Sequence, residues 1–488
     1  MTRTRLFSSA LTALALLAGC VSAPVPEDPG AAWQPPPEIR TAADATWQAV
    51  RGRAAAADRP LTLAELADLA LRHSAATRAA WNNAVAAAAQ VEHAQGLFMP
   101  ELTATGGGSL QQTVSRPSGS DVRQFKYGPG VRLSYLVLNF GGGRAAAVEQ
   151  ALQTVYAADF ACNAAIQGVL LNVATAYSGL VGARAAAAAA ATTVRDAQAA
   201  LDAAQARATA GLGTALDVLQ AQAARDQARY SQAAADGQAL SARGALAQAA
   251  GLPADAPLAV AEPPAEMPAG PDAPDVARLL DEALARRPDI AALRATLAAR
   301  RAAVRVAHAA SWPSLSLDGS LARNWYENYG AGRASADRDW AAFAGASVSW
   351  TIFDGWRTES DIRAAEAAAA AAAAQLEAAV LAAGAEVWSR YQAYAAARQK
   401  VVYSAAFVAS AASAHEQALA AYKAGLKSIL DVLSAETQLA QARALQIAAR
   451  QEVFTALASL AHAAGTLPAG RAVAPADVFP TPTQEPRP

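Results

Sequence analysis

The sequence predicts a mainly α-helical protein with a small β portion, built from two tandem copies of a long helical hairpin. A Gly-Leu turn stands twice between long alanine-rich stretches, as AGLGTALDVLQAQ in residues 210–222 and as AGLKSILDVLSAE in residues 424–436. Further landmarks recur 213 or 214 residues apart: Leu71 and Leu284, Pro100 and Pro313, Phe140 and Phe353, Arg144 and Arg357, Thr214 and Ser428, and Gly251 and Gly465. An offset shared by six pairs indicates a duplicated unit rather than chance similarity.

The N-terminal residues predict a secreted chain that is anchored by a lipid. Arg3 and Arg5 precede a short apolar run over residues 11–18 that ends in LAGC. A basic head, a short apolar core and small residues are typical of a secretory signal, which we expect over residues 1–19. LAGC resembles the lipobox of bacterial lipoproteins, which implies acylation of Cys20, and the absence of Asp after it implies sorting to the outer membrane. The alternative is an ordinary signal peptide with a cysteine near its end.

Composition excludes several classes of function. The net charge of -1, from 40 basic and 41 acidic residues, offers no basic surface for nucleic acid. With Cys20 anchored, Cys162 has no partner, so we expect no intrachain disulfide. The histidines form no metal-ligand spacing; they are His73, His93, His308, His415 and His462. We therefore expect no enzyme activity, no metal and no cofactor.

Changes in composition divide the chain. After the signal peptide we expect a tether over residues 20–60 (extended and Pro-rich at 21–40), repeats at 61–253 and 275–467, a Pro-rich linker at 254–274 and a Pro-rich tail at 468–488. Helices are expected at 61–97, 144–210, 214–250, 274–310 and 357–424. We expect no further helix of uniform apolarity and membrane-spanning length.

Each repeat also contains two segments whose side chains alternate between apolar and polar. They span residues 102–111 and 131–137, with a polar loop at 112–123, and then residues 314–321 and 342–352. Alternation over about ten residues is typical of a transmembrane β-strand, and also of a half-buried soluble sheet. Aromatic residues gather near the strand ends, as in an interfacial girdle: Phe125, Tyr127, Trp312, Trp325, Tyr326, Tyr329 and Trp340.

Geometry favours the membrane alternative. Four strands cannot close a barrel, and an open edge cannot lie in lipid because its backbone groups would be unpaired. Strands from other copies must close it, and three chains would supply twelve. The 67 residues from 144 to 210 would form a helix of about 100 Å, which needs neighbours to pack against. The sequence thus predicts an oligomeric transmembrane β-barrel continued by a helical tube.

Both turns contain the residues that end one helix and begin the next. Gly211 and Gly425 stand where the incoming helix needs a left-handed residue. Thr214 and Ser428 are N-cap residues for the outgoing helices, with Asp217 and Asp431 three positions later as capping partners.

The repeated G-L-x-[TS]-x-x-D-V turn, the duplicated half, and the strand ends NFGGGR and FDGWR resemble the TolC family of outer-membrane efflux proteins over residues 61–467. The resemblance implies a homotrimer in the outer membrane of a Gram-negative bacterium, with a twelve-stranded β-barrel and a periplasmic α-barrel. It also implies a passive exit duct for efflux or type I secretion, opened at its hairpin tips by a periplasmic adaptor (membrane fusion) protein and served by an inner-membrane pump. The alternative is an anchored structural coiled-coil lipoprotein, which would leave the strands unexplained.

The resemblance also implies roles for the tip residues. The expected gate residues are Asp217, Asp431, Tyr422 and Lys427, and the expected adaptor contacts are Gly211, Leu212, Thr214, Gly425, Leu426 and Ser428. Ser434 replaces a second acid of the family's prototype. At the positions that correspond to Tyr422 and Lys427, the first copy has Ala208 and Gly213. We therefore expect the second hairpin to be the moving gate.

Overall fold

The computed structural model describes residues 37–52, 59–115, 120–261, 276–330 and 333–467. The expected signal peptide, the anchor at Cys20 and the tail at 468–488 lie outside these residues. Contacts divide the chain into residues 1–54 and 55–488. The first unit contains the helix α2 (Pro37–Arg51), so an extended tether over residues 21–40 is wrong from Pro37 onward. Proline is compatible with the first turn of a helix, where its missing N–H has no partner to lose.

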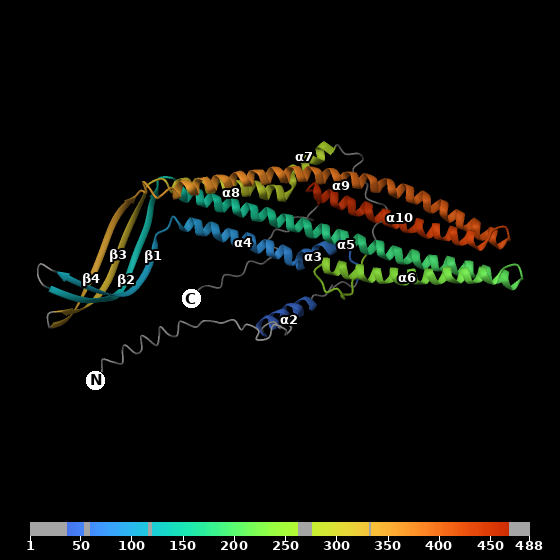
Figure 1. Ribbon diagram of the computed structural model, residues 1–488, viewed down its shortest axis with the longest axis horizontal. Coiled ribbons are helices and arrows are strands. Elements are labelled where there is room, and N and C mark those ends of the chain that lie inside the picture. Colours follow the sequence, from blue (N-terminus) through green and yellow to red (C-terminus); the bar gives the residue numbers. More distant parts are fainter. Residues whose placement is uncertain (1–36, 53–58, 116–119, 262–275, 331–332, 468–488) are drawn as a thin grey trace, which may run out of the picture. The chain divides into compact units, whose positions relative to one another are not determined.

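The second unit contains two series of elements with identical helix lengths (Figure 1). The first series is α3 (Leu63–His73), α4 (Ala75–Gly96), β1 (Glu101–Ser115), β2 (Ser120–Asn139), α5 (Gly143–Thr209) and α6 (Ala215–Ala249). The second is α7 (Val276–Arg286), α8 (Pro288–Ala309), β3 (Ser314–Gly330), β4 (Arg333–Ser349), α9 (Arg357–Lys423) and α10 (Ile429–Ala463). The paired helices have 11, 22, 67 and 35 residues in both series.

The expected helices at 61–97 and 274–310 are each divided in two. In the first, Ser74 is extended (φ -62°, ψ 122°), and its hydroxyl accepts a hydrogen bond from the N–H of Thr77 at 3.1 Å, which begins α4. In the second, Arg287 is extended because it precedes Pro288, and a residue before proline is pushed out of the helical region.

The four strands form one antiparallel sheet in the order β1-β2-β3-β4, with strands of 15 to 20 residues. The expected polar loop at 112–123 is wrong at both ends, because β1 continues to Ser115 and β2 begins at Ser120. Their backbones pair all the way to Ser115 opposite Ser120. The last strand is shifted relative to the expected segment at 342–352: β4 begins earlier, at Arg333, and ends at Ser349, so Trp350 and Ile352 lie beyond it.

The register gives the sheet two different faces, since residues directly opposite each other point to the same side. On one face Leu321 lies opposite Val131 and Ala342, and Trp325 lies opposite Tyr127. The other face is polar, with these opposed pairs: Ser320 with Arg132, Asp318 with Ser134, Asn324 with Asp339, and Asp318 with Gly345. We call the first the apolar face and the second the polar face. Within this unit the sheet lies at one end of the helices and the two hairpin tips lie at the other (Figure 1).

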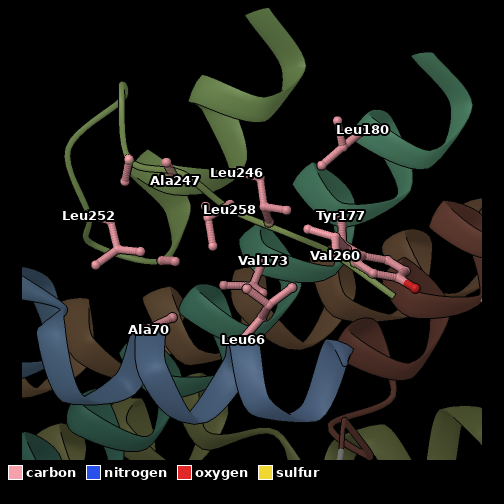
Figure 2. Close-up of a cluster of buried hydrophobic side chains, with 12 residues drawn as sticks. Leu66, Ala70, Val173, Tyr177, Leu180, Leu246, Ala247, Leu252, Leu258 and Val260 are labelled. Carbon is pink, nitrogen blue, oxygen red and sulfur yellow. The ribbon is translucent and has the colours of Figure 1, made fainter. Parts of the chain in front are cut away.

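Each half has its own buried cluster away from the tips. In the first half, Leu66 of α3 packs with Val173 of α5, Leu246 of α6 and Val260 of the segment after α6 (Figure 2). The hydroxyl of Tyr177 donates a hydrogen bond to the carbonyl oxygen of Ala261 at 3.0 Å, which holds that segment against α5. The second half has a corresponding cluster of residues from α7, α9 and α10: Leu279, Ala283, Val387, Tyr394, Ala397, Val453, Ala456, Leu460 and Ala463.

Two expectations about single residues and helices have different outcomes. Cys162 is a free cysteine, as expected. It is buried, which raises the pKa of its thiol, and the nearby Asp159 carboxylate adds to the effect. The expectation of no further apolar helix of membrane-spanning length is wrong by length and composition. Both α5 and α9 contain an 18-residue window of mean hydropathy 1.4. The cause is alanine, which counts as apolar although its side chain is one methyl group.

Candidate functional site

The two hairpin tips have the same backbone construction. Gly211 and Gly425 adopt left-handed φ angles of 73° and 79°, two residues after the ends of α5 and α9. In the first turn the N–H of Leu212 donates to the carbonyl oxygen of Arg207 at 2.9 Å, and the corresponding bond in the second turn has the same length. Only glycine adopts this conformation without a Cβ penalty, so the expected helix ends are confirmed.

The acids of the repeated turn form reciprocal caps on the outgoing helices. The hydroxyls of Thr214 and Ser428 accept hydrogen bonds from the N–H groups of Asp217 and Asp431 at 3.2 and 3.3 Å. Both carboxylates accept in return from the N–H groups of the cap residues, at 3.1 and 3.0 Å. Hydrogen bonding to the backbone N–H of Ser428 lowers the pKa of Asp431. Both acids therefore have the capping role that the sequence predicts.

Lys427 lies on the surface of the second tip. Its Nζ is 3.7 Å from Oδ1 of Asp431, which lies four residues later in the first turn of α10, and both side chains are exposed. Exposed ion pairs of this kind stabilise a helix by less than about 1 kcal/mol. The ion pair with Asp431 is therefore weak and does not hold the Lys427 side chain in one position.

Tyr422 is the buried centre of the contact between the two hairpins. Its side chain is 2% exposed and packs in one cluster with Leu201 of α5 and with Ile429 and Val432 of α10. Among the described residues its hydroxyl has no hydrogen-bond partner. Burial raises the pKa of this hydroxyl, the carboxylate of Asp217 adds to the effect, and a neighbouring guanidinium opposes it. The structure thus brings two of the expected gate residues, Tyr422 and Asp217, close together.

Arg207 connects the hairpins, and the sequence analysis missed it. Its Nη1 donates to the carbonyl oxygen of Tyr422, and its Nη2 donates to that of Leu212 at 3.0 Å. The guanidinium carbon lies 4.9 Å from the centre of the Tyr422 ring. Arg207 stands at the position of Ala421 in the repeat, next to the position of Tyr422. The signal in the sequence was this difference between the copies: the first copy has Arg207 where the second has Ala421, and only the second copy has Tyr422.

A second polar contact between the hairpins lies farther from the tips. Nη1 of Arg443 on α10 lies 2.7 Å from Oδ2 of Asp196 on α5. Glu436, also on α10, is 7% exposed, and its Oε2 has no hydrogen-bond partner among the described residues. Burial raises the pKa of Glu436 to about 7, with Asp196 adding to the effect and Arg443 opposing it. The first copy has Gln222 at the position of Glu436, and this difference was the only sign in the sequence that Glu436 is unusual.

The expected adaptor-contact turns are apolar and open to solvent. Leu212 and Leu426 are 70% and 79% exposed at the two tips, and Leu216 and Leu430 continue the same surface into α6 and α10. Exposed apolar residues gathered in one place are typical of a surface that contacts another protein. In the part of the chain that the structure describes, no cluster of His, Cys, Asp and Glu has the size to hold a metal ion.

Comparison with known proteins identifies the family. Residues 66–252 and 279–466 match the outer membrane efflux protein family. The chain belongs to this family. The matched segments include every residue of the two tips, and the resemblance to the TolC family is confirmed.

This outer membrane efflux protein has curated relatives in two organisms. It is 32% identical to Protein CyaE of Bordetella pertussis over 413 residues, which cover 83% of this chain and 84% of the relative. It is 33% identical to the pyoverdine export outer membrane protein OpmQ of Pseudomonas aeruginosa over 366 residues, covering 68% and 74%.

Solved structures share the fold. The outer-membrane channel OprN is 25% identical, with a TM-score of 0.72 over 83% of this chain and 90% of that one. VceC from Vibrio cholerae, at 22% identity, has a TM-score of 0.71 over 83% and 96%. The protein is an exit duct of the outer membrane, as the resemblance implied.

Proposed function

We propose that three copies of the chain form the duct together. The sheet of one chain ends at β1 and at β4, whose outer edges have no strand partner within its described residues. Lipid offers no hydrogen bonds to such edges, so a sheet in a membrane has to close on itself. Pairing β1 of one copy with β4 of the next closes a barrel of twelve strands in a homotrimer. The apolar face would contact lipid, and the polar face would line the channel.

The helices support the same assembly. Several large apolar side chains on the hairpins are exposed in a single chain, among them Tyr230 (74%), Leu240 (61%), Leu381 (69%) and Val402 (66%). Helices gain most of their stability by packing an apolar face, which neighbouring copies would cover. Three pairs of hairpins would form a periplasmic α-barrel beneath the β-barrel.

The tips would be the gate of this passive duct. The proposed closed state is held by the contact of Tyr422 with the first hairpin, with Asp217, Asp431 and Lys427 around it. A periplasmic adaptor protein would bind the exposed turns at Gly211-Leu212 and Gly425-Leu426, next to the caps Thr214 and Ser428. Energy would come from an inner-membrane pump. The second hairpin would move, because it alone carries Tyr422 and Lys427.

We also propose that the chain is anchored to outer-membrane lipid through Cys20, after removal of residues 1–19. Residues 61–253 and 275–467 would be the two copies of the duplicated unit, joined by the linker at 254–274. The equal lengths of the four pairs of helices support this division.

The observation that carries the proposal is the open-edged sheet with one apolar and one polar face. The rival function, a structural coiled-coil lipoprotein that is anchored in the same way, has no use for such a sheet. It would also place no requirement on the number of copies.

The test is to purify the full-length protein in detergent, measure its mass by light scattering, and record conductance in a planar bilayer. We expect a trimer that conducts ions weakly, and more strongly after Tyr422→Ala. A monomer, or a trimer with no conductance in either form, would reject the duct. In cells fed a labelled fatty acid, Cys20→Ser should lose the label, and a variant that keeps it would refute the anchor.

A further inference from the structure

On the apolar face of the sheet, at the end far from the helices, two arginines of β3 and β4 lie opposite tryptophans. Arg323 of β3 lies opposite Trp340 of β4, and Arg338 of β4 lies opposite Trp325 of β3. Because opposed residues point to the same side, all four side chains share this face. Charged residues are unexpected on the face that the proposed function turns toward lipid.

Aromatic rings surround the first of these cations. The guanidinium carbon of Arg323 lies 5.0 Å from the ring centre of Trp340 and 5.8 Å from that of Trp325. The ring of Trp325 stacks on Tyr127 with centres 5.7 Å apart, and Phe125 follows at 5.5 Å from Tyr127. An Arg held against Trp rings is fixed in direction while its N–H groups stay available.

The position along the strands places this cluster at a membrane surface. From Leu315 to Leu321 the same face of β3 is apolar, and Val348 to Ala342 cover the same level on β4. From Trp350, the residue directly after β4, to Trp340 inside it the chain advances ten residues, roughly 33 Å at the rise of an extended strand, which at the usual strand tilt is about 25 Å of height. That height equals the apolar band of an outer-membrane barrel, so Trp340 and Arg323 lie at the far headgroup level.

Neither guanidinium is neutralised by a carboxylate among the described residues. Asp339 faces the other way, where it accepts hydrogen bonds from Asn324 and Tyr326, both at 3.2 Å. On β3, Glu327 also lies on the apolar face, two residues beyond Trp325, and it has an interaction of its own. An excess of positive charge therefore faces the lipid beside the aromatic rings.

We propose that Arg323 and Arg338, with Trp325 and Trp340, bind the phosphate of a phosphorylated glycolipid in the outer leaflet of the membrane. A guanidinium binds two phosphate oxygens at once, and the indole rings suit the boundary between acyl chains and headgroups. The inference rests on the proposed barrel, which puts the helices in the periplasm and this end of the sheet at the outer leaflet.

The test compares the full-length trimer with the double variant Arg323→Gln/Arg338→Gln. Arg132→Gln is the matched control, because Arg132 lies on the polar face of the same sheet. Each protein is placed in nanodiscs that contain lipid A with both phosphates, lipid A without phosphates, or phosphatidylglycerol. Native mass spectrometry then counts the lipids that remain bound after detergent exchange.

We expect about three molecules of phosphorylated lipid A per trimer for the parent and for Arg132→Gln, and at least a tenfold weaker retention for the double variant. Arg323→Lys/Arg338→Lys should retain an intermediate amount, because lysine keeps the charge but not the fork of donors. Trimer mass should be the same in all variants, and conductance should be unchanged in the variants of Arg323 and Arg338, which lie on the face away from the channel.

Three results would overturn the inference: equal retention by the double variant, equal retention of dephosphorylated lipid A, or displacement of lipid A by millimolar inorganic phosphate. Retention of phosphatidylglycerol in equal amount would reject the glycolipid as the occupant. Failure of the proposed function is distinguishable, because the parent protein itself would then neither trimerise nor conduct.

Discussion

The two hairpins have the same helix lengths and the same caps, yet they bring different side chains to the contact between them. The first hairpin supplies Arg207 and Asp196, and the second supplies Tyr422, Arg443 and the buried Glu436. At the turns themselves the hydrogen bonds agree within 0.1 Å, as in the cap distances of 3.2 and 3.3 Å. The two hairpins therefore differ in the side chains of the surface where they contact each other, and not in their turns.

This difference follows from what a contact between two copies requires. Two identical surfaces complement each other only where each residue matches its own partner across a symmetry axis. In a tandem duplication the copies are free to diverge, so one surface can carry the cation and the other the aromatic ring and the carbonyl oxygen. The backbone of the duplicated unit is conserved in this chain, and its contact surfaces are not.

The largest effect should come from emptying the centre of the contact. Tyr422→Ala leaves a cavity between the hairpins and should destabilise their packing by about 3–5 kcal/mol. Tyr422→Phe removes a hydroxyl that has no partner among the described residues, so it should change stability by less than about 1 kcal/mol. Thermal denaturation of the detergent-solubilised protein measures both. A Phe variant as unstable as the Ala variant would show that the hydroxyl has a partner in the assembled duct.

The next effect depends on pH and belongs to the second hairpin alone. The folded pKa of Glu436, about 7, lies above its ordinary value of 4.5, so the folded state binds the extra proton between these values. Stability should therefore fall as pH rises from 5 to 8. Glu436→Gln should remove up to about 3 kcal/mol of this fall, stabilising the protein at pH 8 and changing little at pH 5.

Unfolding curves at the two pH values test this difference, with Gln222→Glu as the mirror variant in the first hairpin. If Glu436→Gln shifted the melting temperature equally at both pH values, then the carboxyl would not be the titrating group.

Removing the cation of the first hairpin should loosen the tips. Arg207→Ala loses the charge-assisted hydrogen bond to the carbonyl oxygen of Tyr422 and the contact with its ring, a loss of about 2 kcal/mol, or roughly a thirtyfold shift of the closed state toward open. Single-channel recording should show a higher open probability. Arg195→Ala is the control, since Arg195 is exposed on the same helix and bonds only to Thr192 among the described residues. Equal recordings from both variants would remove Arg207 from the gate.

The smallest effect should be the same in both halves. Thr214→Ala and Ser428→Ala each remove one cap hydroxyl, a loss of about 1 kcal/mol per helix. Amide hydrogen exchange at Asp217 and Asp431 should speed up by similar factors. A clear difference between the two would place part of the asymmetry in the turns rather than in the contact.

The sequence predicted the features that are local and repeated. Gly211, Thr214 and Asp217 form a turn whose chemistry lies within eight residues, and the family resemblance supplied the rest of the architecture. Arg207 was missed because its role depends on Tyr422, which is 215 residues away. The break at Ser74 was missed for a different reason. A helix and two shorter helices in line have the same apolar period, so only the cap reveals the division.

The equal length of α5 and α9, at 67 residues each, makes helix length a shared property of the two halves. Each residue added to both helices of a hairpin moves its tip by about 1.5 Å, so seven residues inserted into each helix of one hairpin alone would separate the two tips by about 10 Å. Arg207 could then no longer reach Tyr422. The distance that the duct covers can therefore change only when both copies lengthen together, which ties the evolution of one half to that of the other.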